Sequence, residues 1–96
     1  MITNFSDRTA EDIYNGRNSR YARRLPNELH AKTRRLLDQI NAAPALDTLR
    51  IPPGNRLEKL TGEHSGFWSL RINDRWRIVF RWRENDFYDL QIIDYH

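Results

Sequence analysis

Three side chains that can move or orient protons stand next to one another at the end of the sequence: Asp94, Tyr95 and His96. They follow the largely apolar residues 90–93, which predict a strand that would anchor them against a sheet. A carboxylate, a phenol and an imidazole can together accept a proton, donate one and hold a partner group in place. The tripeptide is therefore a candidate acid–base group.

Arginine supplies the second chemical group. Fourteen of the sixteen basic residues are arginine, and the formal net charge is +3. Residues 17–35 contain seven bases and one acid, and residues 71–83 contain five arginines and one acid, whereas residues 84–96 contain four acids and no Lys or Arg. The planar guanidinium fork suits phosphate groups, and clustered arginines favour a nucleic-acid partner. A solvated basic surface is the alternative.

Other chemistries lack the residues they need. The sequence has no cysteine, which excludes a disulfide scaffold, an iron–sulfur or zinc–thiolate site and a cysteine nucleophile. The four glycines are too scattered for a phosphate-binding loop, and the three histidines form no metal-binding motif. We therefore expect neither a cofactor nor a metal. Because the apolar runs are short and the N-terminus lacks a signal layout, we expect a cytoplasmic protein without membrane contact.

The chemistry that remains is proton transfer beside a cation. It suits cleavage of RNA by its own 2′-hydroxyl. A base takes the hydroxyl proton, an arginine neutralises the phosphate oxygens, and an acid protonates the leaving 5′-oxygen. This route needs no metal ion.

The N-terminal half predicts helices. The length of 96 residues favours a single domain that spans residues 1–96. Residues 2–5 fit a short edge strand, and Ser6 is the expected N-cap of a first helix that ends near residues 15–16.

A second helix is expected over residues 26–42. Pro26 suits its first turn, and the apolar side chains Leu29, Leu36, Leu37 and Ile40 recur on one helical face. A short helical turn should follow at Leu46 and Leu49.

From residue 56 onward the hydrophobic period becomes two, which is typical of strands. One strand is expected within residues 56–60, and apolar residues alternate in three further segments: 68–72, 76–82 and 88–92, with turns at 73–74 and 85–86. This order predicts an α+β fold in which two N-terminal helices pack on one face of a three- to five-stranded antiparallel sheet.

The two faces of that sheet differ in chemistry. One face carries the three tryptophans with Leu, Ile and Phe, and needs the helices as cover. The other face carries a polar and basic row: Arg71, Asn73, Arg75, Arg77, Arg81 and Arg83. Arginines paired across neighbouring strands repel one another unless acids interleave or an anion binds. We interpret this face as an RNA or phosphate site, and a solvent-facing surface neutralised by nearby acids is the alternative.

Several segments together resemble a known family. They are PPGNRLEKL at residues 52–60, GFWSLRINDRWRIVF at 66–80 and DYH at 94–96, with RRLP at 23–26 and NF at 4–5. In this combination the chain closely resembles the HigB toxins, which belong to the RelE/ParE superfamily of bacterial toxin–antitoxin systems. The likeness covers nearly the whole chain.

The resemblance implies a RelE-like fold and a ribosome-dependent endoribonuclease, an mRNA interferase that cuts translated mRNA. It also implies a HigA-like helix-turn-helix antitoxin as partner. Operator DNA would be contacted through that antitoxin, while the toxin itself would contact the ribosome and mRNA and no membrane.

The resemblance also assigns roles to residues. Asp94, Tyr95 and His96 match the family's C-terminal catalytic residues, and Arg77 matches the arginine that holds the scissile phosphate. Glu58 stands where some members carry a catalytic histidine. It is either a general base or an ion-pair partner that leaves His96 as the base, and we expect the two groups to divide the proton transfers.

The remaining expected site residues bind RNA or position other groups. Lys59 and Arg71 should help Arg77 to bind phosphate, and Arg56, Asn73 and Arg75 complete the expected RNA-binding set. Tyr95 would stack on or orient a base, and Asp94 would orient Tyr95 or His96.

Two other functions fit parts of the sequence. A ParE-like toxin of the same fold would inhibit gyrase by binding it, but the DYH ending and the arginine face favour the nuclease. A non-catalytic RNA-binding module would tolerate loss of Tyr95 and His96 with little effect.

Overall fold

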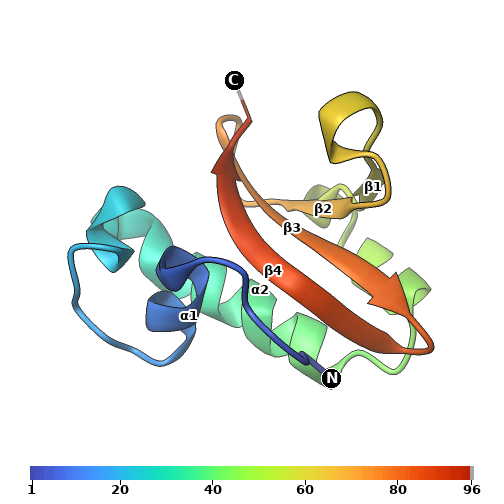
Figure 1. Ribbon diagram of the computed structural model, residues 1–96, viewed down its shortest axis with the longest axis horizontal. Helices are drawn as coiled ribbons and strands as arrows, with labels where there is room; N and C mark the ends of the chain where they lie inside the picture. Colours follow the sequence, from blue (N-terminus) through green and yellow to red (C-terminus); the bar gives the residue numbers. More distant parts are fainter. Residues whose placement is uncertain (96) are drawn as a thin grey trace.

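The computed structural model describes residues 1–95 as two helices packed on one face of a four-stranded antiparallel sheet (Figure 1). The strands follow one another across the sheet in chain order, β1-β2-β3-β4. The elements are α1 (Arg8–Tyr14), α2 (His30–Ala42), β1 (Glu58–Lys59), β2 (Trp68–Arg71), β3 (Trp76–Arg83) and β4 (Asp86–Asp94). The predicted α+β architecture is confirmed.

The core lies between the helices and the sheet. Alternate residues of the strands supply one side of it, among them Leu70, Ile78, Phe80 and Ile92, each at most 1% exposed. The apolar stripe of α2 supplies the other side through Leu36, Leu37 and Ile40, as its spacing predicts. Trp82, which pairs with the buried Phe87 close to the β3–β4 turn, remains 37% exposed and is not part of the buried core.

Both helix starts differ from the expected ones. Asp7, not Ser6, caps α1, since its Oδ1 accepts a hydrogen bond from the backbone N–H of Ala10 at 2.7 Å. The hydroxyl of Ser6 donates instead to the carbonyl of Asp89, 3.1 Å away. After Pro26 the chain makes a 3-10 turn over Asn27–Leu29, and α2 begins only at His30.

The strands expected at residues 2–5 and 56–60 are shorter in the structure than the sequence predicts. β1 contains two residues of the expected 56–60 strand, and residues 2–5 form isolated parallel bridges to β4 at Ile2 and Phe5. The expected helical turn near Leu46 is a 3-10 helix over Leu46–Arg50. Within residues 1–95, no helix is long and apolar enough to cross a membrane.

A β-bulge interrupts the pairing of β3 with β4. Val79 lies opposite Gln91, but Arg81 lies opposite Tyr88, so β4 has one extra residue between these pairs. Asp89 takes a positive φ of 54° there. Its backbone N–H donates to Asn4 Oδ1 at 3.0 Å, and Asn4 Nδ2 donates to its carboxylate at 2.9 Å. The N-terminal segment thereby fixes the bulge.

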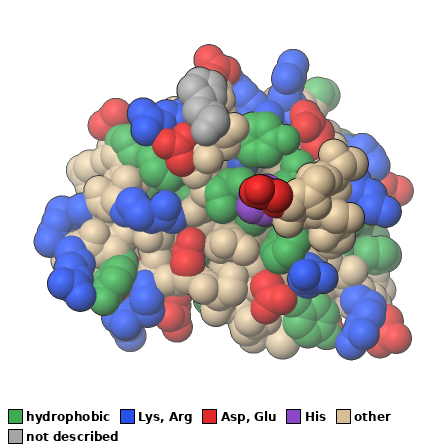
Figure 2. Space-filling view, turned by 45° about the horizontal axis from the view of Figure 1, so that its top comes forward, with side chains coloured by type: hydrophobic (Ala, Val, Ile, Leu, Met, Phe, Trp, Pro, Cys, Tyr) green, Lys and Arg blue, Asp and Glu red, His purple; other side chains and the backbone are tan. Residues whose placement is uncertain are grey.

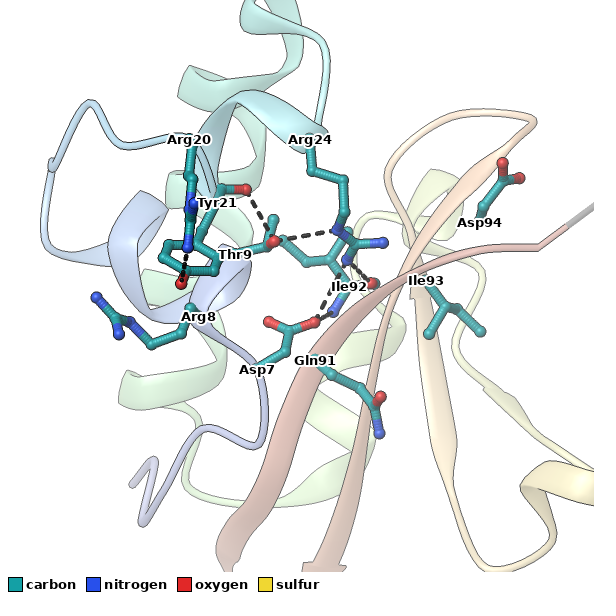
Figure 3. A pocket seen from close by; sticks show the side chains of 10 residues that line it. All are labelled: Asp7, Arg8, Thr9, Arg20, Tyr21, Arg24, Gln91, Ile92, Ile93 and Asp94. Carbon is teal, nitrogen blue, oxygen red and sulfur yellow. Dashed lines mark hydrogen bonds and ion pairs between the residues drawn. The ribbon is translucent and has the colours of Figure 1, made fainter.

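Two charged side chains, Asp7 and Arg24, form hydrogen bonds with the backbone at the outer edge of β4 (Figure 3). Asp7 Oδ2 accepts from the backbone N–H of Ile92 at 3.0 Å, and a guanidinium N–H of Arg24 donates to the Ile92 carbonyl. Arg24 also lies 3.4 Å from Asp7 and donates from Nε to Thr9 at 3.1 Å. These contacts tie the end of β4, and therefore residues 94–95, to the rest of the fold.

Candidate active site

Arg77 is buried on the sheet face opposite the helices. Its neighbours along β3, Trp76 and Ile78, point into the core, so alternation sends Arg77 to the other side. Its side chain is only 10% exposed. Nη1 donates a hydrogen bond to Ser69 Oγ at 3.4 Å and lies 3.8 Å from Glu58 Oε1. The strand register explains this meeting, because Glu58 pairs directly with Ser69 on the neighbouring strand.

Tyr95 completes the cluster. Its backbone N–H donates to the Arg75 carbonyl at 2.7 Å, which extends the β3–β4 pairing by one step. The guanidinium carbon of Arg77 lies 4.7 Å from the centre of the Tyr95 ring, within the range of a cation–π contact. The ring itself is 43% exposed. Residues far apart in the sequence therefore meet at one guanidinium, which lies beside an aromatic surface open to solvent.

The charge at this cluster favours an anion. Arg71 lies directly opposite Arg77 in the β2–β3 register and forms an ion pair with Asp74. Within residues 1–95, Arg77 Nε is buried without a hydrogen-bond partner. A buried donor without an acceptor costs about 1–3 kcal/mol. Arg77 and Arg71 thus place two cations side by side on this face, and a bound phosphate would lie against them.

Asp94 lies close in sequence to Tyr95 but reaches a different partner. It pairs in register with Trp76, and its Oδ2 accepts a hydrogen bond from Arg75 Nε at 2.8 Å and lies 2.7 Å from Nη2. The hydrogen bond from Arg75 and the charge of Asp94 raise the pKa of Arg75 above its ordinary value. His96 lies outside the described residues.

The expected RNA-binding residues are not all brought together. Arg71 lies beside Arg77, but Lys59 lies over the ring of Trp68, with Nζ 5.9 Å from its centre. Arg56 follows the 3-10 turn Pro53–Asn55 with a φ of 47°.

Two residues of the predicted row make their contacts in or beside the β2–β3 turn. Asn73 Oδ1 accepts from the backbone N–H groups of Arg75 at 2.9 Å and Trp76 at 2.8 Å, so its side chain shapes the turn. Arg75 lies over the ring of the buried Trp76, 5.7 Å from its centre. These contacts engage Asn73 within the turn and Arg75 with Trp76 and Asp94, so they do not bring either side chain to Arg77.

Two features of the surface were missed from the sequence. Ser69 holds Arg77, and the alternation that places Arg71 on this face would also have placed Ser69 there. The second feature is a hollow of about 720 Å³ on the helix side of β4 (Figure 3). In it the guanidinium carbons of Arg8 and Arg20 lie 4.7 and 5.0 Å from the ring centre of Tyr21.

Among residues 1–95, no group of acids or histidines is arranged to hold a metal ion.

Comparison with known proteins identifies the family. The fold is that of a RelE-like toxin. The model of the family described as RelE-like toxin of type II toxin–antitoxin system HigB matches residues 3–96, so the chain belongs to that family. It is 37% identical over 82 residues to Toxin HigB-1 of Vibrio cholerae, covering 85% of this chain and 84% of that protein. A shorter match, 39% identical over 41 residues, links 43% of this chain to 45% of Endoribonuclease HigB of Proteus vulgaris.

Solved structures agree with this assignment. The YoeB–YefM toxin–antitoxin complex of Staphylococcus aureus contains a chain that superposes with a TM-score of 0.61 at 25% identity, covering 100% of this chain and 95% of that one. YafQ of Escherichia coli superposes with a TM-score of 0.58 at 14% identity over 98% of this chain and 91% of that one. The second likeness shows the fold alone.

Because Arg77 is incompletely paired, we expect it to contribute to ligand binding and not to the stability of the fold. Removal of one partner of a buried ion pair is costly when the other charge stays buried, but Glu58 is 44% exposed and would remain solvated, so an apolar side chain of similar size can replace Arg77 at little cost. Arg77→Met should therefore keep the free energy of unfolding within about 1 kcal/mol of wild type, or raise it. Urea unfolding measures this, with Arg71→Met as a control that should bring no gain. A loss of more than about 2 kcal/mol would show that Arg77 is a structural residue.

Proposed function

We propose that this protein is an endoribonuclease toxin that cleaves translated mRNA on the ribosome through the 2′-hydroxyl of the RNA. The observation that carries the proposal is the Arg77 guanidinium, which is buried, has an Nε without a partner in residues 1–95, and lies between Glu58 and Tyr95. The family assignment and the name of the Proteus vulgaris relative support it.

The reaction needs one base, one acid and a cation. The base removes the proton of the 2′-hydroxyl, and the 2′-oxygen then attacks the adjacent phosphorus. The bond from phosphorus to the 5′-oxygen breaks, and the acid gives that oxygen a proton. The upstream product ends in a 2′,3′-cyclic phosphate. Arg77, helped by Arg71, would neutralise the non-bridging oxygens, on which negative charge builds up in the transition state.

Glu58 and His96 are the proposed proton-transfer groups. Glu58 lies at the opening of the cluster, since its side chain is 44% exposed and 3.8 Å from Arg77. Tyr95 would hold a base against its exposed ring. Asp94 would act as a positioning residue, because its ion pair with Arg75 joins the end of β4 to the β2–β3 turn next to Tyr95.

The toxin would act in the cytoplasm with a protein partner. The chain seen in the Staphylococcus aureus structure is part of a toxin–antitoxin complex, which supports an antitoxin for this protein. We propose that the antitoxin is a HigA-like helix-turn-helix protein and that operator DNA is contacted through it.

The cleavage reaction can be tested in a reconstituted translation mixture with and without ribosomes. Wild type should cut mRNA only when ribosomes are present. Arg77→Ala should lower the rate by a factor of about 10²–10³, the cost of losing a donor to a developing oxyanion. Arg50→Ala is the matched control, since Arg50 is exposed and pairs with Asp47 away from the site. Absence of cuts from folded wild type, with DNA breaks caused by trapped gyrase, would instead favour a gyrase inhibitor.

The acid and the base can be told apart with a modified substrate. An mRNA with sulfur in place of the bridging 5′-oxygen has a leaving group that needs no proton. Glu58→Gln and His96→Gln should both slow cleavage of ordinary mRNA. The variant that lacks the acid should recover its rate on the sulfur substrate, whereas the variant that lacks the base should not. Recovery of both variants, or of neither, would contradict the proposed division of roles.

A further inference from the structure

A second cluster of aromatic and basic side chains lies farther along the same sheet face. Arg81 follows Arg77 by four residues on β3, and this separation corresponds to about 13 Å along a strand. The fully buried Val79 lies between them on that face. Arg81 is therefore beyond the reach of the groups that would hold the scissile phosphate, but it lies in line with them.

The guanidinium of Arg81 lies over an aromatic ring and beside a carboxylate. Its central carbon lies 4.4 Å from the centre of the Phe67 ring, and His64 lies edge-on to the same ring with the ring centres 6.5 Å apart. Arg81 Nε lies 3.5 Å from Asp89 Oδ2. Asp89 is itself fixed by Asn4 at the bulge, so the guanidinium is held from two sides.

The other side of this guanidinium remains open. The Arg81 side chain is 53% exposed, and it lines a pocket of about 330 Å³ together with Gly66, Trp82, Arg83, Tyr88 and Asp89. A Cβ on Gly66 would come to 3.5 Å from Arg81 Nη1, so Gly66 lies directly beside the guanidinium. Figure 2 shows one face of the molecule, on which basic side chains border apolar and acidic ones.

We propose that Arg81, presented on Phe67, is a stacking subsite for one base of the single-stranded RNA next to the cleaved nucleotide. Flat guanidinium and aromatic surfaces stack on any nucleobase, and Arg83 at the pocket's edge suits the adjoining phosphate. The proposal rests on the proposed nuclease function, and it adds a substrate contact that the chemistry at Arg77 does not need.

The test measures the rate of mRNA cleavage on programmed ribosomes as a function of toxin concentration. Arg81→Lys keeps the charge but removes the flat surface, and Phe67→Leu removes the ring beneath it. Both should raise the half-saturating concentration on the order of tenfold, within the range known for base stacking, and leave the maximal rate unchanged. Arg50→Lys is the matched control and should behave as wild type. Thermal unfolding of each variant shows whether it is folded.

Three outcomes would overturn the subsite. Wild-type behaviour of Arg81→Lys would mean that charge alone suffices, and a fall in the maximal rate alone would place Arg81 in the chemical step. Unchanged cleavage with weakened antitoxin binding would assign the surface to a protein partner.

Failure of the nuclease proposal itself is recognised separately, because wild type would then not cut. In that case the fluorescence anisotropy of a labelled 2′-O-methyl RNA oligonucleotide decides on the subsite. Tighter binding by wild type than by Arg81→Lys would support it, and equal binding would overturn it.

Discussion

The guanidinium of Arg77 is buried in a sheet face that the helices leave uncovered, with the carboxylate of Glu58 3.8 Å away. A charge removed from water needs compensation, and here the pairing within residues 1–95 leaves Nε without an acceptor. The sheet holds the Arg77 guanidinium in a fixed place but does not supply an acceptor for every one of its N–H groups. A buried polar group without a partner calls for an explanation, and a role in binding a phosphate beside it is the one that we propose for Arg77.

The position of β4 determines whether this site is complete. This strand pairs with β3, receives the N-terminal segment along its other edge, and is fixed at Ile92 by Asp7 and Arg24. Tyr95 reaches Arg77 because the strand continues to that point. The bulge at Asp89 shifts the pairing, so that Arg81 and Tyr88 lie opposite one another on the same face. One strand therefore serves both the cluster at Arg77 and the pocket at Arg81.

Much of this arrangement was predictable from the sequence. The period of two in residues 68–82 separates the core side chains from Arg77, and the stripe on α2 predicts what covers the core. The N-cap was not predictable, because Ser6 and Asp7 are both good capping residues and tertiary contacts with β4 engage both. The contacts of Asn73 within the β2–β3 turn and of Arg75 with Trp76 depend on the turn that joins the strands, which alternation does not describe. The bulge depends on Asn4, more than eighty residues away in the chain.

The chemical identity of the RNA ends tests the central claim most directly. mRNA cut by the wild-type protein on ribosomes would be analysed for the groups at both ends of the break. Attack by the 2′-hydroxyl, with Arg77 neutralising the phosphate, predicts a 2′,3′-cyclic phosphate or its hydrolysis product on the upstream fragment and a 5′-hydroxyl on the downstream fragment. A 3′-hydroxyl together with a 5′-phosphate would contradict the account, because water would then be the attacking group.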